Sequence, residues 1–194
     1  DETTHYSIVE QFGNAVSGTT TLNTGYGSKV VVKGAGFILN NEMDDFSSKP
    51  GVPNVYGLVG SKANAIAPEK RMLSSMTPTI VEQNGKLKMV LGTPGGSTII
   101  TSVLQNILNV TEFNMGMQES VNKPRFHHQW LPDVIRMEPN GFNTQTKSKL
   151  ESLGYEILEK NSLIIGRVDA ILVLPNGKLE AGADKRGDDS AVGF

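Results

Sequence analysis

The sequence predicts a layered α+β fold, in which helices cover the faces of β-sheets. Short strand-like segments separated by turn residues open and close the chain. In the segment after Gly96, apolar residues instead recur at helical spacing. Strands on both sides of a helical middle, in a chain of 194 residues, are typical of one domain with mixed layers.

The first predicted element is a β-hairpin. Residues 3–9 are β-branched or aromatic with alternation, residues 11–14 provide a turn, and residues 15–22 resume a threonine-rich strand pattern. Residues 30–39 hold a further apolar stretch interrupted by glycines. The polar segment that follows, residues 40–51, is expected to be a loop.

A second hairpin is predicted around Asn84-Gly85, because this dipeptide favours the tightest hairpin turns. Its strands are residues 78–83 and 86–92. The remaining predicted elements are a helix from Ser97 to about Val110, a helix from Met117 to Asn122, a strand from Val134 to Met137, a helix from Thr144 to Leu153 ended by Gly154, and strands at Tyr155–Leu158, Val168–Leu174 and Lys178–Ala181. Ser97 or Thr98 is the expected cap of the first helix.

Charge and composition exclude several classes of function. Eighteen basic and twenty acidic residues give a net charge of -2, without the run of like charge expected of a nucleic-acid-binding arm. The absence of cysteine excludes disulfides, thiolate catalysis and Cys-based metal sites. No apolar run approaches the roughly 20 residues that a membrane-spanning helix needs. Any export signal is expected to lie upstream, because the N-terminus is polar.

Hydroxyl groups are concentrated near the N-terminus, in TTHYS at residues 3–7 and in TTTLN at residues 19–23. Threonine is a good strand former, so hydrogen bonding within a sheet is the simplest explanation of these residues. In a strand, His5 would share a face with Thr3 and Ser7. A Thr-His or Ser-His catalytic pair is therefore conceivable, although the spacing places no acidic partner beside it.

Several unusual strings occur in a fixed order along the chain. They are TTHYS at 3–7, LNNEMDDF at 39–46, KPGVPNVYGLVG at 49–60, RMLSSMTPTI at 71–80, GTPGGS at 92–97 and PRFHHQWLPD at 124–133. Together they resemble the small catalytic subunit of γ-glutamyltransferases over nearly the whole chain, so that residues 1–194 form one small-subunit region.

The resemblance implies a four-layer αββα sandwich of the N-terminal-nucleophile hydrolase type. It also implies a precursor that cuts itself before Thr3, with a large subunit as partner. In the sequence as given, Asp1 and Glu2 precede Thr3, so its nitrogen is an amide and cannot act as a base. The uncleaved chain, like the chain without its large subunit, is therefore expected to be inactive.

The resemblance also assigns roles to individual residues. Thr3 would be the nucleophile, Thr21 would orient it, the N–H groups of Gly95 and Gly96 would form an oxyanion hole, Asn23, Glu42 and Asp45 would hold the substrate α-amino group, Ser74 and Ser75 its α-carboxylate, and Tyr56 would belong to a lid. An arginine of the large subunit would complete the carboxylate site, and neither cofactor nor metal is implied. Without the resemblance, these residues read as strand threonines, a Gly-Gly turn, a solvated acidic loop, a serine turn and a surface aromatic residue.

The implied reaction transfers a γ-glutamyl group from glutathione or related γ-glutamyl amides to water or to an amino acid or peptide amine. Related acylases that act on cephalosporins or poly-γ-glutamate are the alternative enzymes. A non-catalytic chain that only assembles with its large subunit is the alternative of another class. The resemblance places the protein in the periplasm or outside the cell. His127, His128 and Trp130 are expected to be structural.

Overall fold

The computed structural model of the chain describes residues 3–160 and 164–193. The strands are β1 (Thr3–Val9), β2 (Ala15–Thr21), β3 (Val31–Val32), β4 (Phe37–Ile38), β5 (Thr79–Gln83), β6 (Lys86–Gly92), β7 (Phe126–His127), β8 (Ile135–Met137), β9 (Ile157–Glu159), β10 (Asp169–Val173) and β11 (Leu179–Gly182). The α-helices are α1 (Ile99–Thr111), α2 (Met117–Asn122) and α3 (Thr144–Ser152), and short 3₁₀ turns occupy Glu42–Asp45, Lys62–Asn64 and Gly96–Thr98.

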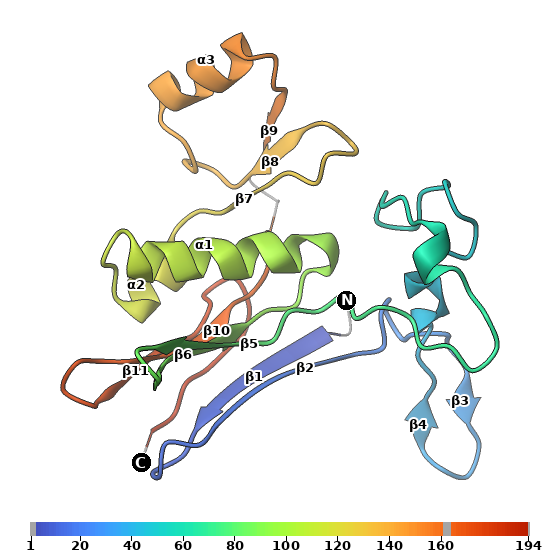
Figure 1. Ribbon diagram of the computed structural model, residues 1–194, viewed down its shortest axis with the longest axis horizontal. Helices are drawn as coiled ribbons and strands as arrows, with labels where there is room; N and C mark the ends of the chain where they lie inside the picture. Colours follow the sequence, from blue (N-terminus) through green and yellow to red (C-terminus); the bar gives the residue numbers. More distant parts are fainter. Residues whose placement is uncertain (1–2, 161–163, 194) are drawn as a thin grey trace.

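Three layers form the body of the molecule (Figure 1). Its centre is a four-stranded antiparallel sheet in the order β11-β10-β6-β5. Helices α1 and α2 cover one face of this sheet, and the antiparallel hairpin β1-β2 packs on the other. The predicted α+β class is therefore confirmed, with the described residues forming a helix layer, a sheet and a second sheet layer.

The core explains why the central strands are so apolar. Met89, Val90 and Leu91 are consecutive in β6, and all three are fully buried. A sheet with one wet face would expose every second residue, so this run requires a cover on both faces. The helices provide one cover through Val103 and Val121, which join the same cluster as Met89 and Leu91.

Turn chemistry made the hairpins predictable. Asn84 and Gly85 both adopt positive φ, of 54° and 71°, as a two-residue hairpin turn requires. β5 and β6 pair on either side of them, as predicted. Asn176 and Gly177 lie in the turn that joins β10 to β11, where Gly177 takes a φ of 81°.

The predicted start of the first long helix is two residues too early. Gly95 and Gly96 take φ values of 143° and 57°, and the chain then makes a 3₁₀ turn that ends at Thr98, so that α1 begins at Ile99. Thr98 occupies the cap position, but its hydroxyl donates to the Gly95 carbonyl at 2.9 Å and caps no helix N–H. The other predicted elements are present with ends shifted by two residues or fewer, and the apolar stretch 30–39 contains the short hairpin β3-β4.

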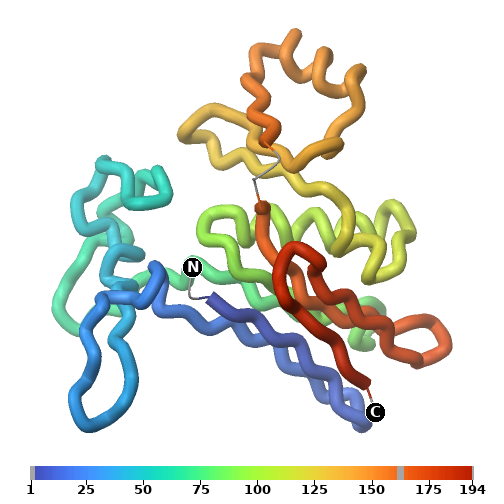
Figure 2. Tube along the Cα trace, turned by 180° about the vertical axis from the view of Figure 1, so that it is seen from behind, coloured from blue at the N-terminus to red at the C-terminus, as the bar shows by residue number. Residues whose placement is uncertain are grey.

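Two less regular regions flank the layers. Residues 22–77 form a lobe of loops beside the N-terminal end of β1, and residues 126–160 carry α3 and the small sheet β7-β8-β9 above α1 (Figures 1 and 2). Both regions meet the body of the molecule near the start of α1. The candidate site lies at this meeting point.

Candidate functional site

The pairing of β1 with β2 brings Thr3 opposite Thr21. Their hydroxyl oxygens are 2.7 Å apart, a hydrogen-bonding distance in which either can donate. Both residues line a cavity of about 720 Å³, whose other walls come from the lobe of residues 22–77, the start of α1 and residues 127–129. The antiparallel register, set by the turn at residues 10–14, is what aligns these two hydroxyls.

Asn23 connects this pair to the lobe. It is buried and has a φ of 75°, a left-handed conformation that asparagine tolerates better than most residues. Its backbone N–H donates to Thr21 Oγ1 at 2.8 Å, and its side-chain oxygen accepts from the Tyr56 hydroxyl at 3.1 Å. One asparagine therefore orients Thr21 and holds the Tyr56 ring.

The Gly95-Gly96 turn lies against the Tyr56 ring. A Cβ atom added to Gly96 would lie 2.7 Å from the nearest ring carbon, so this close approach requires glycine. The turn leads into α1, and small residues before a helix expose backbone N–H groups that can face an anion. Burial, followed by the charges of Asp45 and Asp44, raises the pKa of Tyr56.

One end of the cavity is acidic. Ser75 donates to Asp45 Oδ2 at 2.7 Å, and Ser74 lies next to it in the cavity wall. Glu42 lines an adjoining hollow that shares Asp45, Ser74 and Ser75 with the main cavity. Burial and the charge of Asp45 raise the pKa of Glu42. Carboxylates beside hydroxyl donors can bind an ammonium and a carboxylate together, as a free α-amino acid presents them.

The structure thus brings most of the predicted residues to one cavity. Thr3, Thr21, Asn23, Asp45, Tyr56, Ser74, Ser75 and Gly96 line it. Glu42 lies in the adjoining hollow, and Gly95 directly precedes Gly96 in the turn. Asp1 and Glu2, which flank the predicted cleavage point, lie outside the described residues.

His5 does not pair with Thr3, although the two residues share one face of β1. Its Nδ1 lies 2.8 Å from Thr19 Oγ1 and its Nε2 lies 3.0 Å from Ser7 Oγ, so both ring nitrogens are engaged. The ring is buried between the two sheets against Gly92, where a Cβ atom would lie 2.2 Å from it. Burial lowers its pKa to about 4.

The expected structural cluster at residues 127–130 extends into the site. His127, His128 and Gln129 line the cavity, whereas the Trp130 side chain is exposed. Gln129 donates from Nε2 to the Tyr56 carbonyl at 3.0 Å. Motif reasoning on the histidines alone missed Gln129, since an amide side chain carries no distinctive chemistry in a sequence.

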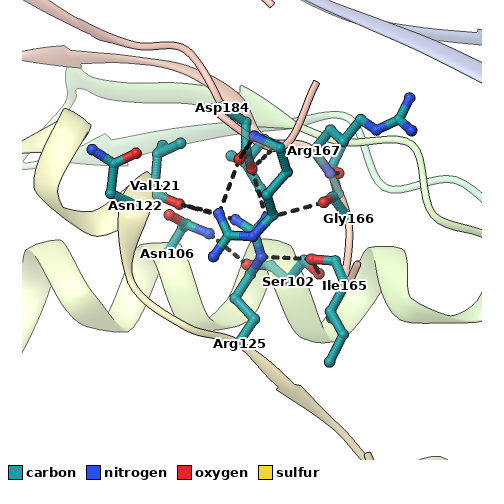
Figure 3. Close-up of polar contacts among 12 residues, drawn as sticks. Ser102, Asn106, Val121, Asn122, Arg125, Ile165, Gly166, Arg167 and Asp184 are labelled. Atoms are coloured by element: carbon teal, nitrogen blue, oxygen red, sulfur yellow. Dashed lines mark hydrogen bonds and ion pairs between the residues drawn. The ribbon is translucent and has the colours of Figure 1, made fainter. Parts of the chain in front are cut away.

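A buried charge network around Arg125 holds the segment of Ile165 and Gly166 (Figure 3). The Arg125 guanidinium bonds to Asp184 Oδ2 at 2.6 Å and donates to the carbonyls of Ile165 and Gly166. A Cβ atom added to Gly95 would lie 3.3 Å from Gly166 Cα, so the arginine holds a segment that lies close to the turn. Burial alone would raise the pKa of Asp184, but the neighbouring Arg125 lowers it below its usual value.

Arg186 extends this network along the C-terminal segment. It bonds to Glu138 at 2.6 Å and to Asp184 Oδ1 at 2.9 Å. The carboxylate of Glu138 also accepts the backbone N–H groups of Arg125 and Ile165. Two arginines and two acids therefore neutralise one another inside the protein, a requirement for charges withdrawn from water.

Among the residues that the structure describes, no three His, Asp or Glu side chains are grouped so as to hold a metal ion. Across residues 3–160 and 164–193, none of the helices has the length and apolar character needed to span a bilayer.

Comparison with known proteins accounts for this arrangement. A family model described as gamma-glutamyltranspeptidase matches residues 1–194. The chain belongs to the γ-glutamyltranspeptidase family. The glutathione hydrolase proenzyme of Escherichia coli (strain K12) is 51% identical over 195 residues, which cover 100% of this chain and 33% of that relative. The chain thus spans about a third of the length of this relative.

Solved structures of the γ-glutamyltranspeptidase family have the same fold. A threonine-to-alanine mutant of the Helicobacter pylori enzyme is 54% identical, with a TM-score of 0.89 over 95% of this chain and 100% of that one. The enzyme of Pseudomonas nitroreducens in complex with L-DON is 49% identical, with a TM-score of 0.89 over 98% and 99%. A cephalosporin acylase from Bacillus halodurans, 25% identical with a TM-score of 0.81, extends the similarity to acylases.

Proposed function

We propose that this chain carries the catalytic threonine of a γ-glutamyl hydrolase and transferase, with Thr3 as its nucleophile. The observation that carries the proposal is the 2.7 Å hydrogen bond between Thr3 and Thr21 in the wall of the cavity. Thr21 already accepts the Asn23 N–H, so its own proton is available for Thr3 Oγ1. Such a bond orients the nucleophilic oxygen and leaves the Thr3 proton free to depart.

Activation would begin with self-cleavage before Thr3. Its hydroxyl oxygen attacks the Glu2 carbonyl carbon, the Glu2–Thr3 C–N bond breaks, and an ester replaces the amide. Breaking this bond frees the Thr3 α-amino group, which takes the proton of the hydroxyl. Water then hydrolyses the ester, which restores the Thr3 hydroxyl and leaves Glu2 with a carboxylate. Because a free α-amino group has a reference pKa of about 7.7 to 8.0, it can accept the proton of its own hydroxyl near neutral pH.

Acyl transfer would follow on the same residue. Thr3 Oγ1 attacks the γ-carbonyl carbon of the donor, and the Gly95 and Gly96 N–H groups stabilise the developing oxyanion. The C–N bond of the donor breaks, and the leaving amine takes the proton held by the Thr3 amino group. Water or an acceptor amine then attacks the γ-glutamyl ester and regenerates Thr3.

The acidic end of the cavity supports a donor with a free α-amino acid head group. Asn23, Glu42 and Asp45 would hold its ammonium, and Ser74 and Ser75 would donate to its carboxylate. These features favour glutathione and related γ-glutamyl amides over the side chains of cephalosporins. The similarity to a cephalosporin acylase keeps that alternative as an outcome of the test.

We propose the remainder of a longer precursor as the partner of this chain, with an arginine that completes the carboxylate site. The 33% coverage of the Escherichia coli proenzyme supports this proposal. Apolar side chains on two outer surfaces support it as well: Tyr6, Ile8 and Val16 on the β1-β2 hairpin, and Ile100, Leu104 and Leu108 on α1 are all at least 39% exposed. A periplasmic or extracellular location stays a prediction.

The proposal is tested by anilide release from a γ-glutamyl anilide, with glycylglycine as acceptor, comparing the complete precursor with its Thr3→Ala variant. Wild type is expected to cleave itself and release anilide, and Thr3→Ala to do neither. Self-cleavage without anilide release would contradict the substrate and favour an acylase. Absence of self-cleavage in wild type would favour the non-catalytic assembly role.

A further inference from the structure

The Tyr56 segment is a compact loop held together by its own hydrogen bonds. We define the lid loop as residues 53–59, whose ends are joined by a bridge between Pro53 and Val59. Asn54 organises its interior: its side-chain oxygen accepts the N–H groups of Tyr56 and Leu58, each at 3.0 Å, and its backbone bonds to Gly57 and Leu58. An internally bonded loop of this kind keeps its shape, so its position depends on its attachments to the rest of the site.

Three contacts attach Tyr56 to the site. Its hydroxyl donates to Asn23, its ring lies against Gly96, and its backbone carbonyl accepts from Gln129. The first two involve residues already assigned to the site. The third comes from the segment after β7, to which the resemblance assigns no role.

We propose that Gln129, aligned by His127, is a latch that holds the lid loop closed over the cavity. The predicted effect on substrate binding rests on the proposed function. The latch itself does not, because it concerns only how the lid loop is held. Gln129 touches none of the reacting atoms, and it is therefore a positioning residue.

Hydrogen bonding fixes the orientation of the Gln129 amide. Its Nε2 donates to two carbonyl oxygens, those of Tyr56 at 3.0 Å and Leu131 at 2.9 Å. Because carbonyls only accept, the nitrogen must face them and Oε1 must face His127. A flipped amide would place its oxygen against both carbonyls and lose all of these bonds.

His127 holds that orientation from the other side. Its Nε2 lies 2.7 Å from Gln129 Oε1 and must carry the proton, because the amide oxygen cannot donate. Its Nδ1 lies 2.8 Å from Thr101 Oγ1, in the first turn of α1. The ring is buried, and burial lowers the pKa of His127, which keeps it neutral with Nδ1 as an acceptor.

The latch therefore ties the lid loop to the helix that follows the glycine turn. Thr101, His127, Gln129 and Tyr56 form one chain of hydrogen bonds from α1 to the loop. The helix that follows the proposed oxyanion donors therefore also supports the loop. Loss of the latch leaves the loop with its Asn23 bond and its ring contact, and so shifts it towards open conformations.

The test uses the self-cleaved complete precursor with two variants of Gln129. Gln129→Met removes every hydrogen bond of the amide. Gln129→Glu keeps the size of the side chain and its oxygen toward His127, but removes both N–H donors. Gln105→Met is the matched control, since Gln105 also joins α1 to β7, through two bonds to Phe126, without reaching the lid loop.

Amide hydrogen exchange of the peptide containing residues 54–58 is the first measurement. We expect exchange roughly fivefold faster in both Gln129 variants, the size of effect that loss of one neutral hydrogen bond produces, and no change in Gln105→Met. Exchange in α1 and β6 should stay as in wild type. Unchanged exchange in both variants would overturn the latch.

The second measurement is the kinetics of γ-glutamyl anilide hydrolysis. A closed loop holds substrate and transition state alike, so KM is expected to rise roughly fivefold while kcat changes less than about twofold. If the Gln129 variants hydrolyse the anilide with the KM and the hydrogen exchange of wild type, the latch is refuted and the proposed function stands. Faster exchange in a protein that hydrolyses no anilide refutes the function and supports the latch.

Discussion

At the residue scale, the site depends on a few side chains that hydrogen-bond to one another. Thr21 accepts from Asn23 and has one proton left for Thr3, and Asn23 uses its backbone for Thr21 and its side chain for Tyr56. These groups therefore form one connected hydrogen-bond network around Thr3. Removing one group should affect the reaction more than the fold.

Thr21→Val tests the orienting hydroxyl, because valine keeps the shape and removes the donor. Loss of a hydrogen bond to an oxygen that changes charge during the reaction should lower kcat by roughly tenfold to a hundredfold. Thr20→Val, on the exposed face of the same strand, is the control and should retain activity. Steady-state kinetics on the precursor measure both, and equal losses in the two variants would refute the role of Thr21.

Glu42 should make substrate binding sensitive to acid. Burial and Asp45 raise its pKa, so the carboxylate loses its charge at a higher pH than an ordinary glutamate does. KM for the donor should therefore rise as the pH falls through this raised pKa. Glu42→Gln should raise KM at neutral pH and flatten that part of the profile, whereas Glu82→Gln, at an exposed position, should match wild type. A wild-type profile that persists in Glu42→Gln would exclude this assignment.

At the scale of elements, the β1-β2 hairpin positions Thr3 because it is fastened to the central sheet. His5 lies between the layers against Gly92, Ser7 donates to the Asp169 carbonyl, and Ser17 donates to the Leu91 carbonyl. Apolar packing has no preferred direction, so these polar contacts determine the position of the hairpin on the sheet.

Gly92→Ala should loosen this junction. The added methyl group would overlap the His5 ring, and overpacking of this kind costs about 1 to 3 kcal/mol. The midpoint of thermal unfolding of the precursor should fall accordingly. Gly25→Ala, where the same atom would meet open space, is the control. An unchanged midpoint for Gly92→Ala would show that the hairpin is not held by this contact.

Local signals in the sequence predicted elements well and their junctions poorly. Asn84-Gly85 determines its own turn, so β5 and β6 could be located from the sequence. The start of α1 was misplaced because the positive φ values of Gly95 and Gly96 and the 3₁₀ turn before the helix leave no signal in the hydrophobic periodicity. The two-residue strand β7 has too few residues for any periodicity.

At the scale of the whole molecule, the buried charges tie distant segments together. Arg125 follows α2, Glu138 follows β8, and Asp184 and Arg186 follow β11, yet the four form one network. No pattern in the sequence relates residues 59 positions apart, such as Arg125 and Asp184, so this network was not predictable. The site residues were predicted by resemblance, whereas their support required the structure.

Asp184→Asn should destabilise the protein strongly. Arg125 is 1% exposed, and removal of its partner leaves a buried charge uncompensated, at a cost of about 3 to 5 kcal/mol. Urea unfolding of the precursor, followed by a probe of this region, measures the loss. Asp188→Asn, at an exposed position nearby, should cost little. Similar stability in both variants would contradict the structural importance of the network.

The most direct test of Thr3 as nucleophile is peptide mass spectrometry of the complete precursor, quenched in acid during turnover of a γ-glutamyl anilide. We predict a new chain that begins at Thr3, with the mass of one γ-glutamyl group added to that residue. A γ-glutamyl group on a different residue, or turnover by a precursor still intact between Glu2 and Thr3, would contradict this mechanism.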